Sequence, residues 1–394
     1  GPAVTLVPTG SPVIVQPGRV GAGYGGRRLG IDTFKYSLPD LPSDARWFDG
    51  VRQFTYSAWI KRYHGSWADL IRTPDSSVSI SPASVVNVYI CSEYFTVSGF
   101  VAVGRWTHIA VSVSTTENSA TIQIYVDGLH LGGTTKSRTS CPTGIASASF
   151  GGQMAGIDDM RLYNRILSSD EIAALCPVDM RGLIFHAPYD SDANDYSGYG
   201  RIATQIGAPY SYERNGRVGR GSANTGSGVH AGQKYESTFD VKQMIQAGGF
   251  SFSIWVYAKF ANSNPSWLRF WRDNSNYLTM YSLFDTRNNN PYRLIMGSWA
   301  TGSTPSYTIQ QPTWSTISNR WIHVVFAIDG SLTPKTWVNG KLEIQNIPIN
   351  ITDGELQLIT TNYMGTSQSQ WQDVELDDLR IYDRALTQAD VDVL

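Results

Sequence analysis

Residues 157–165 read IDDMRLYNR, and residues 376–384 read LDDLRIYDR. Both stretches alternate apolar residues with an Asp-Asp pair, an arginine and a tyrosine, and they lie 219 positions apart. Three further blocks recur upstream in the same order: 54–60 with 250–256, 105–111 with 320–326, and 125–128 with 337–340. Four blocks in one order indicate an internal duplication, so the chain is predicted to contain two copies of one module.

Each recurring block has the alternation of a β-strand. Every second residue from Phe54 to Ile60 falls on one face, and the polar Thr55 and Ser57 fall on the other. The third blocks end in Asp-Gly and Asn-Gly, which tolerate the positive φ of a two-residue hairpin turn. Capping-box spacing at 168–171 and a similar start at 387–390 predict a short helix after each closing stretch. The sequence therefore predicts an all-β protein of two tandem antiparallel β-sandwich (jelly-roll) domains with short C-terminal helical turns.

The duplication also predicts the domain boundaries. Each copy ends with the same closing segment, which assigns residues 21–177 to the first domain and 178–394 to the second. The second copy holds 19 more residues between its first two blocks. Residues 1–20 are rich in Pro and Gly and are predicted to form a linker or arm. The first domain lacks a clear copy of the opening at 183–190, so its first strand is predicted to be divergent.

Composition narrows the function classes. Charged residues make up 16% of the 394 residues and the net charge is −2, so no basic excess suggests a nucleic-acid partner. No stretch approaches the roughly 18 apolar residues of a membrane span, and membrane insertion is not expected. The three cysteines are widely spaced and odd in number, which predicts thiols rather than a disulfide framework. No signal peptide is visible at the start of the sequence.

The recurring motifs resemble the concanavalin A-like lectin/glucanase superfamily, in particular its laminin-G-like and pentraxin-like branch. That branch has a strand ending in S-x-W-[IV], a W-x-H-[IV] strand, a Y-[VI]-[DN]-G hairpin and a closing D-D-x-R stretch. Residues 195–200 (DYSGYG) also resemble its D-x-S-G-x-G element. The resemblance implies a sandwich of about twelve to fourteen strands and, usually, binding rather than catalysis.

Catalysis as a glycoside hydrolase would depend on the carboxylates. Glycoside hydrolysis needs two carboxyl groups facing one sugar, and the glucanase branch places its acids as E-x-D-x-x-E on one strand. Glu375 and Asp377 begin that pattern, but Arg380 stands where the last acid should be. The matched His108 and His323 have no recurring nucleophile or acid beside them, which predicts a structural role. The chain is therefore expected not to be an enzyme, and a glycoside hydrolase is the third alternative.

Aromatic residues indicate where a sugar would bind, because sugar rings stack on Trp and Tyr. The tryptophans within the recurring blocks are predicted to be scaffold. The longer interval of the second domain adds further aromatics among many asparagines, and its candidate ligand-binding residues are Trp267, Trp271, Tyr277, Tyr292, Trp299 and Trp314. The alternative for this set is that the side chains only cover a sheet face.

Four aspartates are the candidate metal ligands. Asp190, Asp192 and Asp195 crowd one loop, and Asp377 lies in the closing stretch. Calcium prefers six to eight oxygen ligands, and the resemblance implies calcium at a sandwich edge. The alternative is that the loop aspartates cap turns and that the closing stretch forms a structural polar pair.

These observations predict a non-enzymatic carbohydrate-binding or adhesion protein that recognises a cell-surface glycan or polysaccharide. The duplicated module, the arm, the odd thiol count and the lack of a signal suit part of an extracellular surface or virion assembly, such as a phage tail or capsid, with other subunits as further partners. The second alternative is a structural protein–protein interaction or capsid-decoration module that binds no sugar.

Overall fold

The computed structural model describes residues 7–9, 13–15, 23–25, 35–37, 53–63, 65, 67–72, 76–90, 93–97, 101, 103–116, 118–137, 149–150, 155–207, 211–213, 216–219, 222–224, 231–258, 266–273, 276–284, 292–299, 306–309, 320–344, 355–361 and 374–394. The chain divides into two compact units, Gly1–Arg181 (unit 1) and Gly182–Leu394 (unit 2). The sequence predicts the boundary after Pro177, and the structure divides the chain after Arg181. No helix among the described residues is long and apolar enough to cross a membrane.

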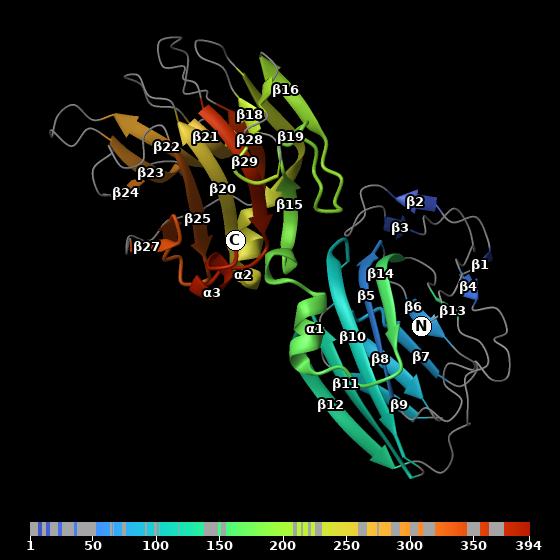
Figure 1. Ribbon diagram of the computed structural model, residues 1–394. Coiled ribbons are helices and arrows are strands. Elements are labelled where there is room, and N and C mark those ends of the chain that lie inside the picture. Colours follow the sequence, from blue (N-terminus) through green and yellow to red (C-terminus); the bar gives the residue numbers. More distant parts are fainter. Residues whose placement is uncertain are drawn as a thin grey trace. The chain divides into compact units, whose positions relative to one another are not determined.

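Unit 1 contains two antiparallel sheets (Figure 1). The first has the order β1 (Val7–Thr9), β4 (Lys35–Ser37), β13 (Ser149–Phe150), β6 (Ala68–Arg72), β7 (Ser76–Ile80), β8 (Val86–Ile90) and β9 (Glu93–Val97). The second has the order β12 (Leu129–Ser137), β11 (Ser119–Val126), β10 (Trp106–Thr115), β5 (Gln53–Arg62), β14 (Ala155–Tyr163), β3 (Gly23–Gly25) and β2 (Val13–Val15).

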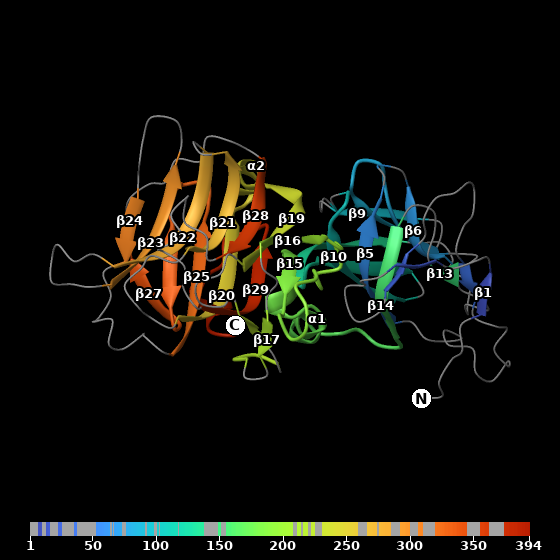
Figure 2. The same cartoon turned by 90° about the horizontal axis from the view of Figure 1, so that it is seen from above.

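Unit 2 also contains two antiparallel sheets (Figure 2). One has the order β17 (Ser211–Glu213), β18 (Ser222–Asn224), β29 (Val374–Tyr382), β20 (Phe250–Ala258), β25 (Trp321–Ile328), β26 (Lys335–Val338) and β27 (Lys341–Ile344), and β15 (Leu183–Ala187) pairs with β29. The other has the order β16 (Ala203–Gly207), β19 (Ala231–Asp240), β28 (Glu355–Thr361), β21 (Ser266–Asp273), β22 (Asn276–Phe284), β23 (Tyr292–Trp299) and β24 (Ser306–Ile309).

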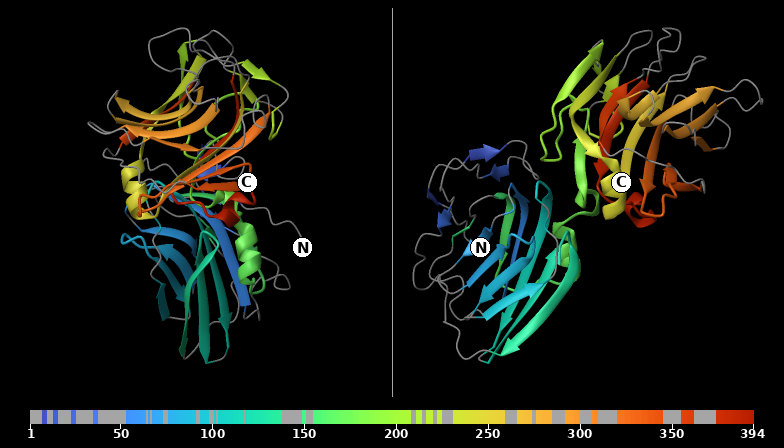
Figure 3. Two further views of the ribbon diagram at one scale, coloured as in Figure 1. Left: turned by 90° about the vertical axis from the view of Figure 1, so that its left-hand side faces the viewer. Right: turned by 180° about the vertical axis from the view of Figure 1, so that it is seen from behind.

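The strand orders of the two units correspond one to one, except for β15. The β17-β18-β29-β20-β25-β26-β27 order repeats β2-β3-β14-β5-β10-β11-β12, and the second sheets correspond in the same way. No described strand of unit 1 takes the place of β15. The predicted all-β, duplicated sandwich is therefore confirmed, with the two layers of each unit visible in Figure 3.

The structure differs from the prediction at residues 1–20, which were expected to be an arm. β1 and β2 lie in this range and pair with β4 and β3 of unit 1. Strands of three residues are too short to show a period of two. The prediction of an arm therefore followed the Pro and Gly content, and the β-branched run at Val13–Val15 was not recognised as a strand.

Local chemistry places two irregular positions at equivalent points of both copies. The hairpin turns have positive φ at Asp127 and Gly128, and again at Asn339 and Gly340, as the Asp-Gly and Asn-Gly pairs predict. The second Asp of the closing stretch also has positive φ, 47° at Asp378, where β29 shifts its register against β20. Such a bulge bends the strand and redirects its side chains.

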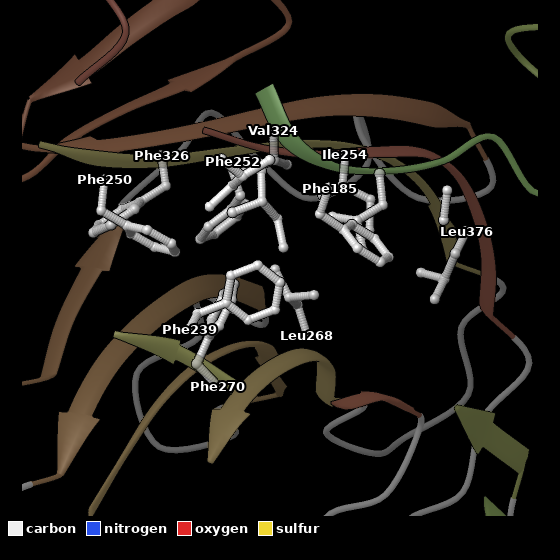
Figure 4. Close-up of a cluster of buried hydrophobic side chains, with 14 of the residues drawn as sticks. Phe185, Phe239, Phe250, Phe252, Ile254, Leu268, Phe270, Val324, Phe326 and Leu376 are labelled. Atoms are coloured by element: carbon white, nitrogen blue, oxygen red, sulfur yellow. The ribbon is translucent and has the colours of Figure 1, made fainter. Parts of the chain in front are cut away.

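The core of unit 2 lies between its sheets (Figure 4). Phe252 of β20 stacks on Phe326 of β25 with ring centroids 5.3 Å apart, and Phe270 of β21 reaches them from the opposite sheet. All three side chains are buried. The alternating apolar residues of the recurring blocks thus form the inner layer, as the period of two predicts.

The expected closing helices are α1 (Ser169–Leu175) and α3 (Gln388–Val391), both with capping boxes. A further helix, α2 (Val241–Ala247), follows β19 and was not predicted. Asp240 caps it by accepting the main-chain N–H of Gln243, and Val241 and Ile245 are buried at i and i+4. One buried pair is too short a pattern to predict a helix.

Candidate functional site

A pocket of about 670 Å³ opens on unit 2, outside the apolar core. Trp255 of β20 and Trp321 and His323 of β25 contribute to its lining. Their sequence neighbours Ile254 and Val324 are buried in the core, so the pocket lies on the outer face of this sheet. Trp255 and Trp321 are half-buried, which leaves part of each indole available to a ligand.

The hairpin turn and α3 form another side of the pocket. Asn339 and Gly340 of the turn line it together with Asp392 after α3. Gln388 of α3 donates through Nε2 to the Gly340 carbonyl at 3.0 Å and accepts from the Trp337 indole N–H at 2.7 Å. These bonds tie the helix to the β26–β27 hairpin, close to which Figure 1 shows α3. These hydrogen bonds therefore hold this side of the pocket in place.

Arg217 enters the pocket from the connection between β17 and β18. Its guanidinium lies 4.8 Å from the ring centroid of Trp255, in cation–π geometry. The main-chain N–H groups of Arg217 and Val218 donate to Oδ2 of Asp377 at 2.6 and 2.8 Å. The buried Asp377 carboxylate therefore fixes the backbone that carries Arg217, whose side chain is exposed.

Burial raises the pKa of Asp377 to about 7, although the N–H groups of Val218 and Arg217 favour its charged form. The nearby charge of Asp378 raises the pKa further. The other carboxylate oxygen, Oδ1, is buried and accepts no hydrogen bond from the described residues. Ionised Asp377 thus carries a desolvation cost that its two N–H donors only partly offset.

Replacing Asp377 with asparagine is expected to remove a pH-dependent loss of stability. The carboxyl pKa rises from 3.8 to about 7 on folding, so its contribution is fully present below the lower value and is lost as pH rises through the higher one. Asparagine keeps an oxygen for the two N–H donors but does not ionise. The melting temperature of D377N minus that of the wild type should rise from about pH 5 to about pH 8. A flat or falling difference, measured in matched buffers, would contradict this assignment.

His323 is held in a structural role beneath the pocket. Its Nε2 lies 2.7 Å from the Ser253 hydroxyl, and its ring stacks on Trp255 at 4.7 Å. Its main-chain N–H donates to Oδ1 of Asn339 at 2.9 Å. Burial lowers the pKa of His323 to about 4, so the imidazole is neutral near pH 7. The Ser253 hydroxyl that it contacts is itself buried, at 1% exposed, and no carboxylate of the described residues forms an ion pair with the ring.

The matching face of unit 1 is covered. Trp59 and Trp106, which correspond to Trp255 and Trp321, are only 1% and 3% exposed. The Arg181 guanidinium lies where a Cβ on Gly128 would meet it at 2.9 Å, whereas nothing lies within 4 Å of the same position on Gly340. The same scaffold thus presents a pocket lined by two tryptophans in unit 2, whereas the corresponding tryptophans of unit 1 are buried.

The predicted aromatic residues are distributed over neighbouring strands of the other sheet of unit 2. Trp267 and Trp271 lie in β21, Tyr277 in β22, and Tyr292 and Trp299 in β23. The register pairs Trp271 with Tyr277 and Tyr277 with Trp299, so these three positions form one row across the strands. The side chains of all five, and the whole of Trp314, lie outside the described part of the structure. Sugar binding by this set stays a prediction.

Asp195 organises the loop after β15. Its Oδ1 accepts the main-chain N–H groups of His186 and Ser197 at 3.1 and 2.9 Å, and Oδ2 accepts that of Arg201 at 3.1 Å. The Arg201 guanidinium is 3.7 Å away, and the Asp195 side chain is fully buried. These contacts are those of an aspartate that shapes a turn.

The other predicted calcium ligands have separate surroundings. Asp192 accepts the N–H of Asn194 and the hydroxyl of Tyr196, and Asp190 lies against Gly219. No group of three or more His, Cys, Asp or Glu side chains suited to a metal occurs in the described part of the chain, which includes all four predicted aspartates. The calcium site therefore stays a prediction that this geometry does not support.

From their place in the recurring blocks, Trp255 and Trp321 are predicted to be scaffold, and none of these blocks predicts a role for Arg217. The structure shows that all three line the pocket. A signal for Arg217 is present, because Gly-Arg-Val-Gly occurs at 216–219 and again at 18–21. The occurrence at 18–21 lies outside the described residues. Whether the recurring hairpin turn is covered depends on long-range contacts such as that of Arg181 with Gly128, which no local pattern reveals.

Solved structures similar to this chain share low sequence identity with it. The botulinum neurotoxin type G receptor binding domain is 17% identical, with 54% of this chain and 50% of that chain covered and a TM-score of 0.41. Domain 4 of AbnA, an extracellular arabinanase from Geobacillus stearothermophilus, was solved with arabinotriose and is 18% identical. The match covers 53% of this chain and 96% of that chain, with a TM-score of 0.40. A heptameric SAP-like pentraxin from Limulus polyphemus is 12% identical, with 32% of this chain and 71% of that chain covered and a TM-score of 0.26. The match thus spans half the length of that receptor binding domain.

No curated protein sequence matches this chain. A family match does cover it, over residues 37–173 and 230–392, which lie in unit 1 and unit 2 respectively. These segments include all four recurring blocks of each copy and make up more than half of the chain. The chain therefore belongs to the concanavalin A-like lectin/glucanases superfamily.

Proposed function

We propose that this protein is a non-enzymatic carbohydrate-binding protein that acts through the pocket of unit 2. The observation that carries the proposal is the open pocket on the outer sheet face, with two half-buried indoles beside polar side chains. The Trp321 indole can stack on the C–H face of a sugar, whereas Trp255 already contacts the His323 ring and the Arg217 guanidinium. The Arg217 guanidinium and the Asn339 amide can bond to sugar hydroxyl groups. We further place the protein at an extracellular surface or in a virion, as one part of a larger assembly.

A non-enzymatic role is supported by the state of the carboxylates. Asp377 is fully buried and accepts two main-chain N–H groups, so it cannot reach a sugar. Asp378 accepts from Nε2 of His186 at 2.8 Å and from Nε of Arg380 at 3.1 Å. Burial opposes ionisation of Asp378, yet these two partners hold its pKa below the ordinary value. Neither group is placed as the acid of a glycosidase pair.

Trp321→Ala is expected to weaken glycan binding by about tenfold or more, as truncation of a central aromatic residue does in binding sites. The measurement is a glycan array with the full chain, with calcium and with chelator, followed by titration of the best ligand. The control is Trp67→Ala in unit 1, which removes a tryptophan that is 53% exposed and should leave binding unchanged.

Equal losses in both variants, or no loss in Trp321→Ala at an unchanged melting temperature, would contradict the pocket as the site. Binding lost on chelation would support the calcium prediction, and binding indifferent to chelator would remove it. Failure of the wild type to bind any glycan would overturn the carbohydrate-binding proposal.

If the wild type binds no glycan, an assembly role is favoured, and one observation supports that role. β12 forms an end of its sheet and is exposed along most of its length, including Leu129 at 59% and Leu131 at 40%. A long edge strand offers main-chain groups for pairing with another chain. Light scattering and cross-linking of the purified protein would detect such self-association.

A further inference from the structure

We infer that the pocket of unit 2 recognises a carboxylate-bearing saccharide and that Arg217 holds the carboxylate. The inference rests on the proposed carbohydrate-binding function and names its ligand class. The carboxylate can belong to a uronic acid or to a sialic acid, because both present the same planar anion to a guanidinium.

The guanidinium of Arg217 is positioned but not neutralised. It stacks over Trp255, and no carboxylate of the described residues forms an ion pair with it. Its backbone is held by the two bonds to Asp377. The guanidinium carbon lies over the Trp255 ring, and its N–H groups form no hydrogen bond or ion pair with the described residues. The planar fork of N–H groups can therefore match a carboxylate in bidentate geometry. A pre-positioned arginine loses less freedom on binding than a mobile one.

The remaining lining supplies little charge that would compete for Arg217. His323 is neutral, because burial keeps its pKa at about 4. Asp392 contributes the single carboxylate among the lining residues, and its Oδ1 already accepts a hydrogen bond from Gln388 Nε2 at 2.7 Å. Trp321 offers an aromatic surface for the sugar ring. The pocket thus combines a stacking surface with a cation that has no anionic partner among the described residues.

Unit 1 provides an internal contrast. At its matching turn, Arg181 covers Gly128 and donates through Nε to the Cys176 carbonyl at 3.0 Å. Its Asp127 pairs with Arg105 at 2.9 Å, whereas the corresponding residue in unit 2 is the uncharged Asn339. The cations at this face of unit 1 are thus engaged within the fold, and only unit 2 is expected to bind the acidic sugar.

The test measures dissociation constants of the full chain for two matched pairs of probes. Oligogalacturonate is compared with its carboxyl-reduced form, and sialyllactose is compared with lactose. The wild type should bind the acidic member of at least one pair about tenfold to a hundredfold more tightly, as expected for hydrogen bonds to a charged group. Arg217→Gln should lose that preference, and Arg217→Lys, which keeps the charge but not the fork, should retain only part of it.

Arg320→Gln is the matched control. Arg320 is exposed and precedes Trp321 in sequence, but it does not line the pocket, so this variant changes the net charge equally and should keep the preference. Melting temperatures of all variants check that the fold is intact. The Arg217 variants should melt like the wild type, because the main-chain donors to Asp377 are unaffected by the side-chain change.

Equal affinity for the acidic and neutral members of both pairs would overturn the inference while leaving carbohydrate binding intact. An unchanged preference in Arg217→Gln would also overturn the inference, because Arg217 would then not hold the carboxylate. An equal loss in Arg320→Gln would overturn it too, because charge attraction at long range would then explain the preference. A wild type that binds none of the four probes but binds a neutral glycan on the array would reject the carboxylate and keep the function. No binding on the array would reject both.

Discussion

Replacing Phe252 with alanine is expected to lower the free energy of unfolding of unit 2 by about 3–5 kcal/mol. The side chain is fully buried and stacks on Phe326 at 5.3 Å, with Phe270 at 6.1 Å from the opposite sheet. Truncation removes its apolar area and leaves a cavity that the paired strands of two hydrogen-bonded sheets cannot close. Hydrogen exchange of the β20 and β25 amides under native conditions would measure the loss.

The control for this experiment is Val393→Ala. Val393 is 61% exposed, so its truncation should change the free energy of unfolding by no more than about 0.5 kcal/mol. A loss below about 1 kcal/mol in Phe252→Ala would mean that the core rearranges to fill the space. That result would contradict the tightly packed aromatic layer described here.

Replacing Asp195 with alanine is expected to destabilise unit 2 by about 3–5 kcal/mol. Three buried or partly buried main-chain N–H groups would lose their acceptor, and the guanidinium of Arg201 would lose its ion-pair partner. Arg201 is itself largely buried and lies over the ring of Phe239 at 4.6 Å. Burial lowers the pKa of Arg201, an effect that the charge of Asp195 opposes. Urea unfolding with calcium absent would measure the loss.

Asp192→Ala is the matched control from the same loop. Among the described residues, Asp192 bonds only to the exposed Asn194 and Tyr196, so its loss should be about 0.5–1 kcal/mol. If the aspartates instead held calcium together, the wild type would gain stability on adding the ion, and both variants would lose that gain equally. Equal destabilisation of the two variants without calcium would contradict the turn-shaping role of Asp195.

The sequence alone determined the fold class and its duplication. The period of two in residues 54–60 and 250–256 predicted the paired β5 and β20, and the Asp-Gly and Asn-Gly pairs predicted the two hairpin turns. Such features are local, because a strand face or a turn type depends on residues within a few positions of one another. The capping boxes of α1 and α3 were predicted for the same reason. The strands in residues 1–20 and helix α2 were missed because each carries too few residues to show a period.

The tertiary structure decided the site. Trp59 and Trp255 occupy the same position in the same motif, yet one is 1% exposed and the other lines a pocket. Arg217 reaches Trp255 because Asp377, 160 positions away in sequence, holds its backbone. Arg181 covers the matching turn of unit 1. These outcomes depend on contacts between residues far apart in the chain. The sequence pattern determines which face of a strand a side chain takes, and only the folded chain determines whether another group covers it.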